Sequence, residues 1–214
     1  RGHAPAFCYT VDRNFVFTAS DGTTQIPHEI ENFTSTGSLT AWVKVPQISS
    51  VANTDIYLYY GNPSSTNQQN PAGVWDSNYL GVWHLQESGT GAQGEFRDST
   101  SNANNGQGGD GDALYVPTRV AGGKTGYAQN FSNADGKWDF IDVGQNPVLD
   151  LTGNGITLEA WVQHEVTSNP PAGHSIEAFY GILNHKGWYD GYSIWMQGDH
   201  WQCPTSEANC VQFN

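Results

Sequence analysis

The sequence predicts an all-β protein made of two antiparallel β-sandwich units, and three observations favour this fold class. The chain of 214 residues contains 25 Gly, 10 Pro and 13% aromatic residues but only 14% charged residues, a composition typical of short strands joined by many turns. No segment repeats apolar residues at the spacing of three and four that an amphipathic helix requires. Several segments instead alternate apolar and polar residues, as half-buried strands do.

The first group of predicted strands lies within residues 14–63. Residues 15–17 lead into the polar turn of residues 20–23, whose Asp-Gly pair is typical of a hairpin. Residues 39–45 place Leu, Ala, Val and Val on one face and Thr, Trp and Lys on the other, which predicts a strand with one dry face. Residues 55–60 repeat the alternation through Ile56, Leu58 and Tyr60, and a Gly-Asn-Pro sequence ends the strand.

A polar stretch rich in Ser, Thr, Asn and Gln, residues 64–73, predicts a linker. We therefore place a domain boundary near Asn70, which gives a first domain of residues 1–70 and a second of residues 71–214. The second domain contains six predicted strands, at residues 80–85, 128–131, 140–143, 156–162, 181–184 and 192–196.

The net charge and the lengths of the apolar runs limit which partners and which cellular location the sequence allows. The net charge is −13, and the 8 Lys and Arg residues are scattered, so no basic stripe exists to bind nucleic acid. No apolar run approaches the roughly 20 residues that a membrane span needs. Acidic, oxygen-rich surfaces suit exported proteins and offer ligands for calcium. We expect an extracellular or cell-surface location.

The three cysteines favour an oxidising compartment. Cys203 and Cys210 bracket a short loop that a disulfide could close, and we predict this bond. Cys8 then has no partner in the sequence.

Three ordered blocks, residues 17–31, 37–46 and 56–63, carry a family resemblance. Together they resemble a bacterial and archaeal surface domain of unknown function that commonly precedes laminin-G-like domains. The resemblance implies a β-sandwich with no established catalytic residues. It covers only the latter part of the pattern, so we expect opening strands that the sequence does not contain.

A second resemblance covers the later residues, in blocks 81–85, 98–106, 126–131, 140–144 and 149–162. These are similar to laminin-G-like and pentraxin-like domains, which implies a concanavalin A-like jelly roll that binds glycans or proteins, often with calcium. The sequence stops before the closing strands of such a jelly roll. We therefore expect flanking sequence or other chains to complete the sheets.

A loop of oxygen-bearing residues is the candidate metal site. Asp98, Asn102 and Asn105 offer the hard oxygen ligands that calcium prefers, and the second resemblance implies calcium at such a loop. Because calcium takes 6–8 oxygens, Asp135, Asp139 and Asp142 are candidates for further ligands. The alternative is a solvated Asx-turn loop.

The sequence contains none of the common motifs of catalytic sites. A glycosidase needs two carboxylates across a cleft, whereas Glu159 stands alone on its predicted strand, and Glu29 and Glu31 are interpreted as surface charges at a polar strand end. The seven histidines show no zinc spacing, and His84 is predicted to be a hydrogen-bonded core residue. No Ser or Cys nucleophile signature occurs either. We expect no enzymatic activity.

Aromatic residues near the C-terminal end suggest a ligand surface. Trp188, Tyr189 and Trp201 could form a platform for sugar rings, although aromatic residues at alternating positions usually fill sandwich cores. Asn32 and Asn130 lie in N-glycosylation sequons. The function expected is a non-catalytic structural or adhesive module that binds a glycan or a protein. The alternative is an accessory carbohydrate-binding region of a secreted hydrolase.

Overall fold

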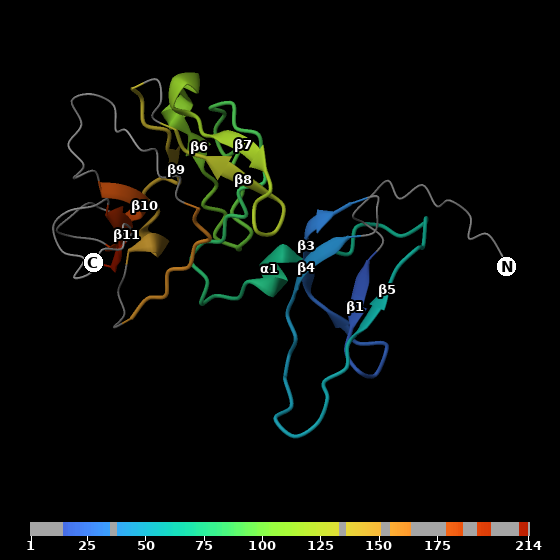
Figure 1. Ribbon diagram of the computed structural model, residues 1–214. Helices are drawn as coiled ribbons and strands as arrows, with labels where there is room; N and C mark the ends of the chain where they lie inside the picture. The colour runs from blue at the N-terminus through green and yellow to red at the C-terminus, as the bar shows by residue number, and fades with distance from the viewer. Residues whose placement is uncertain are drawn as a thin grey trace. The chain divides into compact units, whose positions relative to one another are not determined.

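The computed structural model describes residues 15–34, 38–132, 136–150, 155–163, 179–185, 192–197 and 210–213. Over these residues the regular secondary structure is mainly strands joined by loops, and the one α-helix has four residues, Pro71–Val74 (α1) (Figure 1). Three short 3-10 turns occur at Gly109–Gly111, Ala113–Tyr115 and Pro147–Leu149. The predicted all-β class is confirmed.

The chain divides into two compact units, residues 1–144 and 145–214. The division falls after Gly144, whereas the sequence pattern places a boundary near Asn70. No helix in the described ranges has the length and apolarity that a bilayer crossing requires.

Two small antiparallel sheets open the first unit. One has the strand order β2 (Gln25–Ile26), β1 (Val16–Thr18), β5 (Tyr57–Tyr59), and the other pairs β3 (His28–Phe33) with β4 (Leu39–Val43). Both sheets contribute to one apolar core, which consists of Phe15, Phe17, Ile26, Ile30, Phe33, Leu39, Ala41 and Val43, with Ala19 beside it. The arrangement is consistent with a β-sandwich, and the predicted dry face of β4 is confirmed.

The predicted Asp-Gly hairpin joins β1 to β2. The Asp21 carboxylate accepts hydrogen bonds from the backbone N–H groups of Thr23 and Thr24 at 2.9 and 2.8 Å. Gly22 has a φ of +72°, a conformation that glycine adopts without steric cost. The side-chain hydroxyl of Thr24, followed by these backbone donors, lowers the pKa of Asp21 to about 2.

The rest of the first unit is loop-rich. Asn70 caps α1 by accepting the N–H of Gly73 at 3.0 Å, and its own N–H donates to the His28 carbonyl on β3 at 2.9 Å. Two further antiparallel pairs follow, β6 (Gln107–Gly108) with β9 (Ile141–Asp142), and β7 (Thr118–Ala121) with β8 (Tyr127–Asn130).

Two predicted strands are wrong. Residues 80–85 form one isolated bridge, from Trp83 to Asp98, because Leu85 has a φ of +58° that turns the backbone out of an extended line. Residues 156–162 are irregular, and Ile156 and Trp161 are exposed. No strand in the described residues pairs with this segment, so its alternating pattern buries no face.

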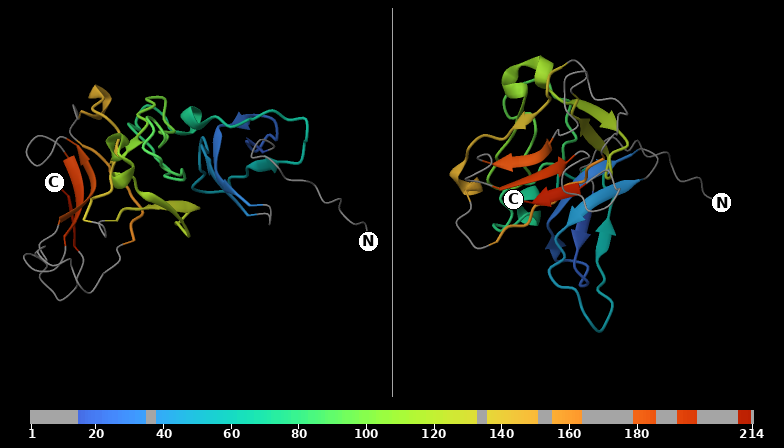
Figure 2. Two further views of the ribbon diagram at one scale, coloured as in Figure 1. Left: turned by 90° about the horizontal axis from the view of Figure 1, so that it is seen from above. Right: turned by 60° about the vertical axis from the view of Figure 1, so that its left-hand side comes forward.

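In the described part of the second unit, one antiparallel sheet has the order β10 (Phe179–His185), β11 (Tyr192–Gln197), β12 (Cys210–Phe213), and its strands lie side by side in Figure 2. The predicted strands at residues 181–184 and 192–196 are confirmed. The His185 ring lies 5.1 Å from the Tyr192 ring, and its Nε2 lies 3.0 Å from the Asp150 carboxylate.

Candidate functional site

The outer face of β3 carries two carboxylates. Ile30 points into the apolar core, so period-two alternation places Glu29 and Glu31 on the opposite face. Trp42 pairs with Glu29 across the β3–β4 register and shares this face. A β-bulge between Ile30 and Asn32 leaves Glu31 without a partner residue on β4.

A loop segment from later in the chain covers this face. Its His84 ring stacks on Trp42 with 5.9 Å between ring centroids, and Trp75 lies 5.3 Å from Trp42. Tyr79 packs edge-on against Trp75 at 5.1 Å. The carboxylates are therefore enclosed by aromatic rings.

His84 bridges the two carboxylates. Its Nε2 lies 3.1 Å from Glu29 Oε2, and its Nδ1 lies 2.5 Å from Glu31 Oε2. The side chains of His84 and Glu31 are only 16% and 1% exposed. We call Glu29, His84 and Glu31 the Glu–His–Glu cluster.

Neutral donors complete the cluster around Glu29. Trp75 Nε1 donates to Glu29 Oε2 at 2.7 Å, and the Ser99 hydroxyl donates to Oε1 at 2.5 Å. With His84, these donors engage both carboxylate oxygens.

Glu31 is engaged in the same way. Trp42 Nε1 donates to its Oε2 at 2.6 Å, while Gln86 Nε2 and the Thr125 hydroxyl donate to its Oε1 at 2.5 and 3.3 Å. Every oxygen and ring nitrogen of the Glu–His–Glu cluster thus has a partner within the first unit.

These contacts determine the charge states of Glu29, His84 and Glu31. Burial disfavours the charged imidazolium, but the hydrogen bonds to Glu29 and Glu31 outweigh it and raise the pKa of His84 to about 9. Burial likewise opposes ionisation of both carboxyls, yet the hydrogen bonds led by His84 lower the pKa of Glu29 and of Glu31. At neutral pH the cluster holds two carboxylates and one imidazolium, a net charge of −1.

The interpretation of Glu29 and Glu31 as surface charges is wrong. Glu29 is 8% exposed, and Glu31 is enclosed as described above. The signal that could have placed them is the alternation with Ile30, together with a tryptophan on the supposedly wet face of residues 39–45. The prediction that His84 is a hydrogen-bonded, largely buried residue is confirmed.

The predicted calcium loop is organised around Asp98. Its Oδ1 accepts the N–H groups of Val82 and Thr100 at 3.0 and 2.9 Å, and its Oδ2 accepts the Thr100 hydroxyl and the Asn104 N–H, both at 2.9 Å. This geometry favours the Asx-turn alternative, because a calcium ion would have to compete with four donors.

The other proposed ligands are only partly brought together. Asn105 Oδ1 accepts the Asp98 N–H at 3.0 Å, whereas the Asn102 amide donates to the Leu80 carbonyl at 3.1 Å. Asp139 and Asp142 accept the backbone N–H groups of Ser132 and Gly144, and Asp135 lies outside the described residues. No group of three or more metal-ligating side chains occurs in the part of the chain that the structure describes. Calcium binding stays a prediction.

One substitution distinguishes a calcium site from an Asx-turn loop at Asp98. Asp98→Asn replaces one carboxylate oxygen with an N–H donor, so we expect a loss of about 2–3 kcal/mol of unfolding free energy even in chelator. Urea unfolding of the wild type and of Asp98→Asn, with and without calcium, measures this loss. A wild-type protein that calcium stabilises, and a variant that calcium does not, would instead support ligation.

The remaining predicted site residues mostly lie outside the described residues. Trp188, Tyr189, Trp201 and Cys203 are among them, as is Cys8. Cys210 begins β12, and the Cys203–Cys210 disulfide stays a prediction. Glu159 is exposed and lies in no strand.

One family match covers all three residues of the Glu–His–Glu cluster. Residues 13–103 match a domain of unknown function, DUF2341. The match supports the coarser part of the first resemblance, a domain of unknown function, and it continues past Asn70 to include His84 and Ser99. No curated protein and no solved structure matches the chain. The laminin-G-like character of the later residues stays a prediction.

Proposed function

We propose that this chain is a non-catalytic structural or adhesive module of an extracellular or cell-surface protein, which binds a glycan or a protein. The observation that supports the proposal most is the complete internal pairing of the Glu–His–Glu cluster. A buried ion cluster in which every polar atom has a partner holds segments together. Here it joins β3 and β4 of the DUF2341 region to the loops that follow them.

The charge states also favour a structural role for the cluster over a catalytic one. A glycosidase acid must hold a proton near neutral pH, which requires a raised carboxyl pKa. Glu29 and Glu31 have lowered pKa values instead. A general base would need a lone pair that a substrate can reach, whereas both His84 nitrogens face carboxylates.

We also propose the finer architecture that the sequence implies for the later residues, a laminin-G-like jelly roll. The antiparallel order β10-β11-β12 supports it, because jelly rolls are built from antiparallel sheets.

A paired assay of binding and turnover tests the function. The purified chain is incubated with insoluble polysaccharides, and both the retained protein and the released reducing sugar are measured. We expect retention without release. Release of sugar by the wild-type chain, abolished in Glu29→Gln with an unchanged circular dichroism spectrum, would contradict the proposal.

A further inference from the structure

A fully buried histidine lies in the core of the first unit, outside the Glu–His–Glu cluster. His28 begins β3 and is 0% exposed, and its ring packs against Phe17 of β1 with 5.2 Å between ring centroids. Neither Nδ1 nor Nε2 has a hydrogen-bond partner within the described residues. Because a neutral imidazole carries one N–H donor and one acceptor, His28 leaves both of them unsatisfied in the core.

The side chains beside this ring are apolar. Phe15 and Phe17 lie in the core at β1, Ile26 contributes from β2, and Val43 is the register partner of His28 on β4. None of these residues carries a charge. The ring of His28 therefore lies in a part of the core that stabilises its neutral form.

The charged side chains next to this part of the core have other partners. Glu29 follows His28 in β3 but lies on the outer face, where His84 contacts it at 3.1 Å. Lys44, which follows the register partner of His28, forms an exposed ion pair with Asp76 at 3.4 Å. Among the described residues, no carboxylate is therefore in contact with His28 to stabilise an imidazolium.

The charge state of His28 links folding to pH. Burial lowers the pKa of His28 from its ordinary value of 6.5, although the backbone carbonyls of Ile26 and Phe15 oppose this shift. The contribution of neutral His28 is therefore fully present above pH 6.5 and is lost as the pH falls through the folded pKa. The lowered pKa values of Glu29 and Glu31 keep both carboxyls ionised above pH 4.5. Mild acid thus acts on His28 before it acts on the Glu–His–Glu cluster.

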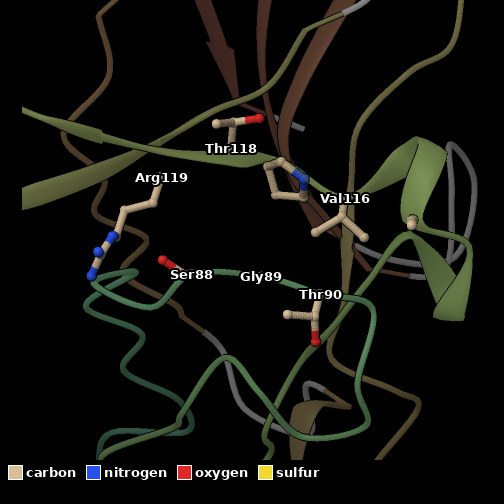
Figure 3. Close-up of a pocket in the computed structure, with 8 residues that line it drawn as sticks. Ser88, Gly89, Thr90, Val116, Thr118 and Arg119 are labelled. Atoms are coloured by element: carbon tan, nitrogen blue, oxygen red, sulfur yellow. The ribbon is translucent and has the colours of Figure 1, made fainter.

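Other parts of the described chain offer few alternative sources of a response to mild acid. The pocket drawn in Figure 3 is lined by residues 88–90, 113 and 116–119, which include no histidine and no carboxylate. His84 is already an imidazolium below about pH 9. His185 contacts Asp150 in the second unit, so a variant at this position can serve as a control.

The backbone of β3 also holds the segment that leads to the Glu–His–Glu cluster. The carbonyl of His28 accepts the N–H of Asn70 at 2.9 Å, and the N–H of Ile30 donates to Gln69 Oε1 at 2.7 Å. Asn70 caps α1, and the residue that follows this helix is Trp75, whose indole donates to the cluster. The start of β3 therefore connects the buried histidine to residues that cover the cluster.

We propose that His28 is an acid-sensitive switch, whose protonation opens the start of β3 and releases residues 69–75 from this strand. An imidazolium has two N–H donors and a positive charge, and the closed core provides neither a hydrogen-bonded acceptor nor a carboxylate for it within the described residues. Opening gives the ring access to water. Because the released segment includes Trp75, the outer face of β3 becomes accessible in mild acid and is covered again near neutral pH.

Amide hydrogen exchange of the full chain, followed by NMR and corrected for the intrinsic pH dependence of exchange, tests the proposal. Between pH 6.5 and pH 5 the opening equilibrium constant of the β3 amides should rise about tenfold, because opening is coupled to the uptake of one proton. The Asn70 amide should open together with them. His28→Met, which replaces the ring by an uncharged side chain of similar size, should show no such rise. The control His185→Gln removes a histidine from the second unit and should keep the wild-type response.

An equal rise in the wild type and in His28→Met would overturn the proposal, and so would a rise that disappears in His185→Gln. An Asn70 amide that stays protected at pH 5 while β3 opens would refute the release of residues 69–75. If His28→Met does not fold, His28→Gln takes its place, and the ring nitrogen chemical shifts of the wild type give a second measurement. A neutral His28 ring in the folded protein at pH 5.5 supports the switch, whereas an imidazolium there overturns it.

Discussion

Glu31→Gln should destabilise the first unit by about 3–5 kcal/mol, the cost of removing one member of a buried ion pair. Glutamine keeps the shape of the side chain but replaces one acceptor oxygen with an N–H donor. That donor would face either Trp42 and His84 or Gln86 and Thr125, all of which donate to Glu31 in the native structure. The imidazolium of His84 would keep Glu29 as its one anionic partner.

Urea unfolding followed by tryptophan fluorescence measures the effect, because Trp42 and Trp75 contact the cluster. Asp55→Asn is the matched control, since it removes a carboxylate from an exposed position in the same unit. The double variant Glu31→Gln with His84→Gln should be much less destabilised than the sum of the two single changes. A loss below about 1 kcal/mol in Glu31→Gln would refute the structural role of the cluster.

Stability should fall on the alkaline side of neutrality by roughly 1.4 kcal/mol per pH unit, the value for one proton. The folded pKa of His84 is raised from 6.5 to about 9. The contribution of His84 is therefore fully present below pH 6.5 and is lost as the pH rises through about 9. Glu29 and Glu31 act in the opposite direction, since their lowered pKa values make a contribution that is present above pH 4.5 and lost as the pH falls through the folded pKa values.

The measurement is the urea midpoint between pH 6 and pH 10, for the wild type and for His84→Gln. Other groups titrate at high pH, so the difference between the two proteins isolates His84. We expect the unfolding free energy to decline with rising pH more steeply in the wild type than in His84→Gln, by roughly 1.4 kcal/mol per pH unit. Parallel profiles would show that His84 is not held as an imidazolium in the native state.

Features set by neighbouring residues could be predicted from the sequence. The dry face of β4 and the Asp-Gly hairpin depend on alternation and turn chemistry within a few residues, and both appear in the structure. The strands β10 and β11 likewise contain the predicted ranges. These patterns need no knowledge of which distant segment packs on them.

The Glu–His–Glu cluster could not be predicted in the same way. Glu31 lies on the face of its strand opposite Ile30, where the local pattern predicts solvent exposure, and its burial depends on His84, which lies more than fifty positions later. The strand predicted over residues 80–85 failed for a related reason. Trp83 donates to the Asn104 carbonyl and His84 contacts β3, so these apolar and aromatic side chains serve tertiary contacts instead of a regular ladder.

The hydrogen bonds of Glu31 join residues that are far apart in the sequence, and this separation affects the order of folding during biosynthesis. Glu31 is separated from Gln86 by 55 residues and from Thr125 by 94 residues. A ribosome that adds about 5–20 residues per second needs roughly 5–20 s to deliver the last of these donors. The hairpins formed by β1–β2 and β3–β4 can close during that interval, while the Glu31 carboxylate stays hydrated on the nascent chain. The buried charges are therefore assembled late, after the local sheets, and variants of the cluster should slow the final compaction more than the formation of the hairpins.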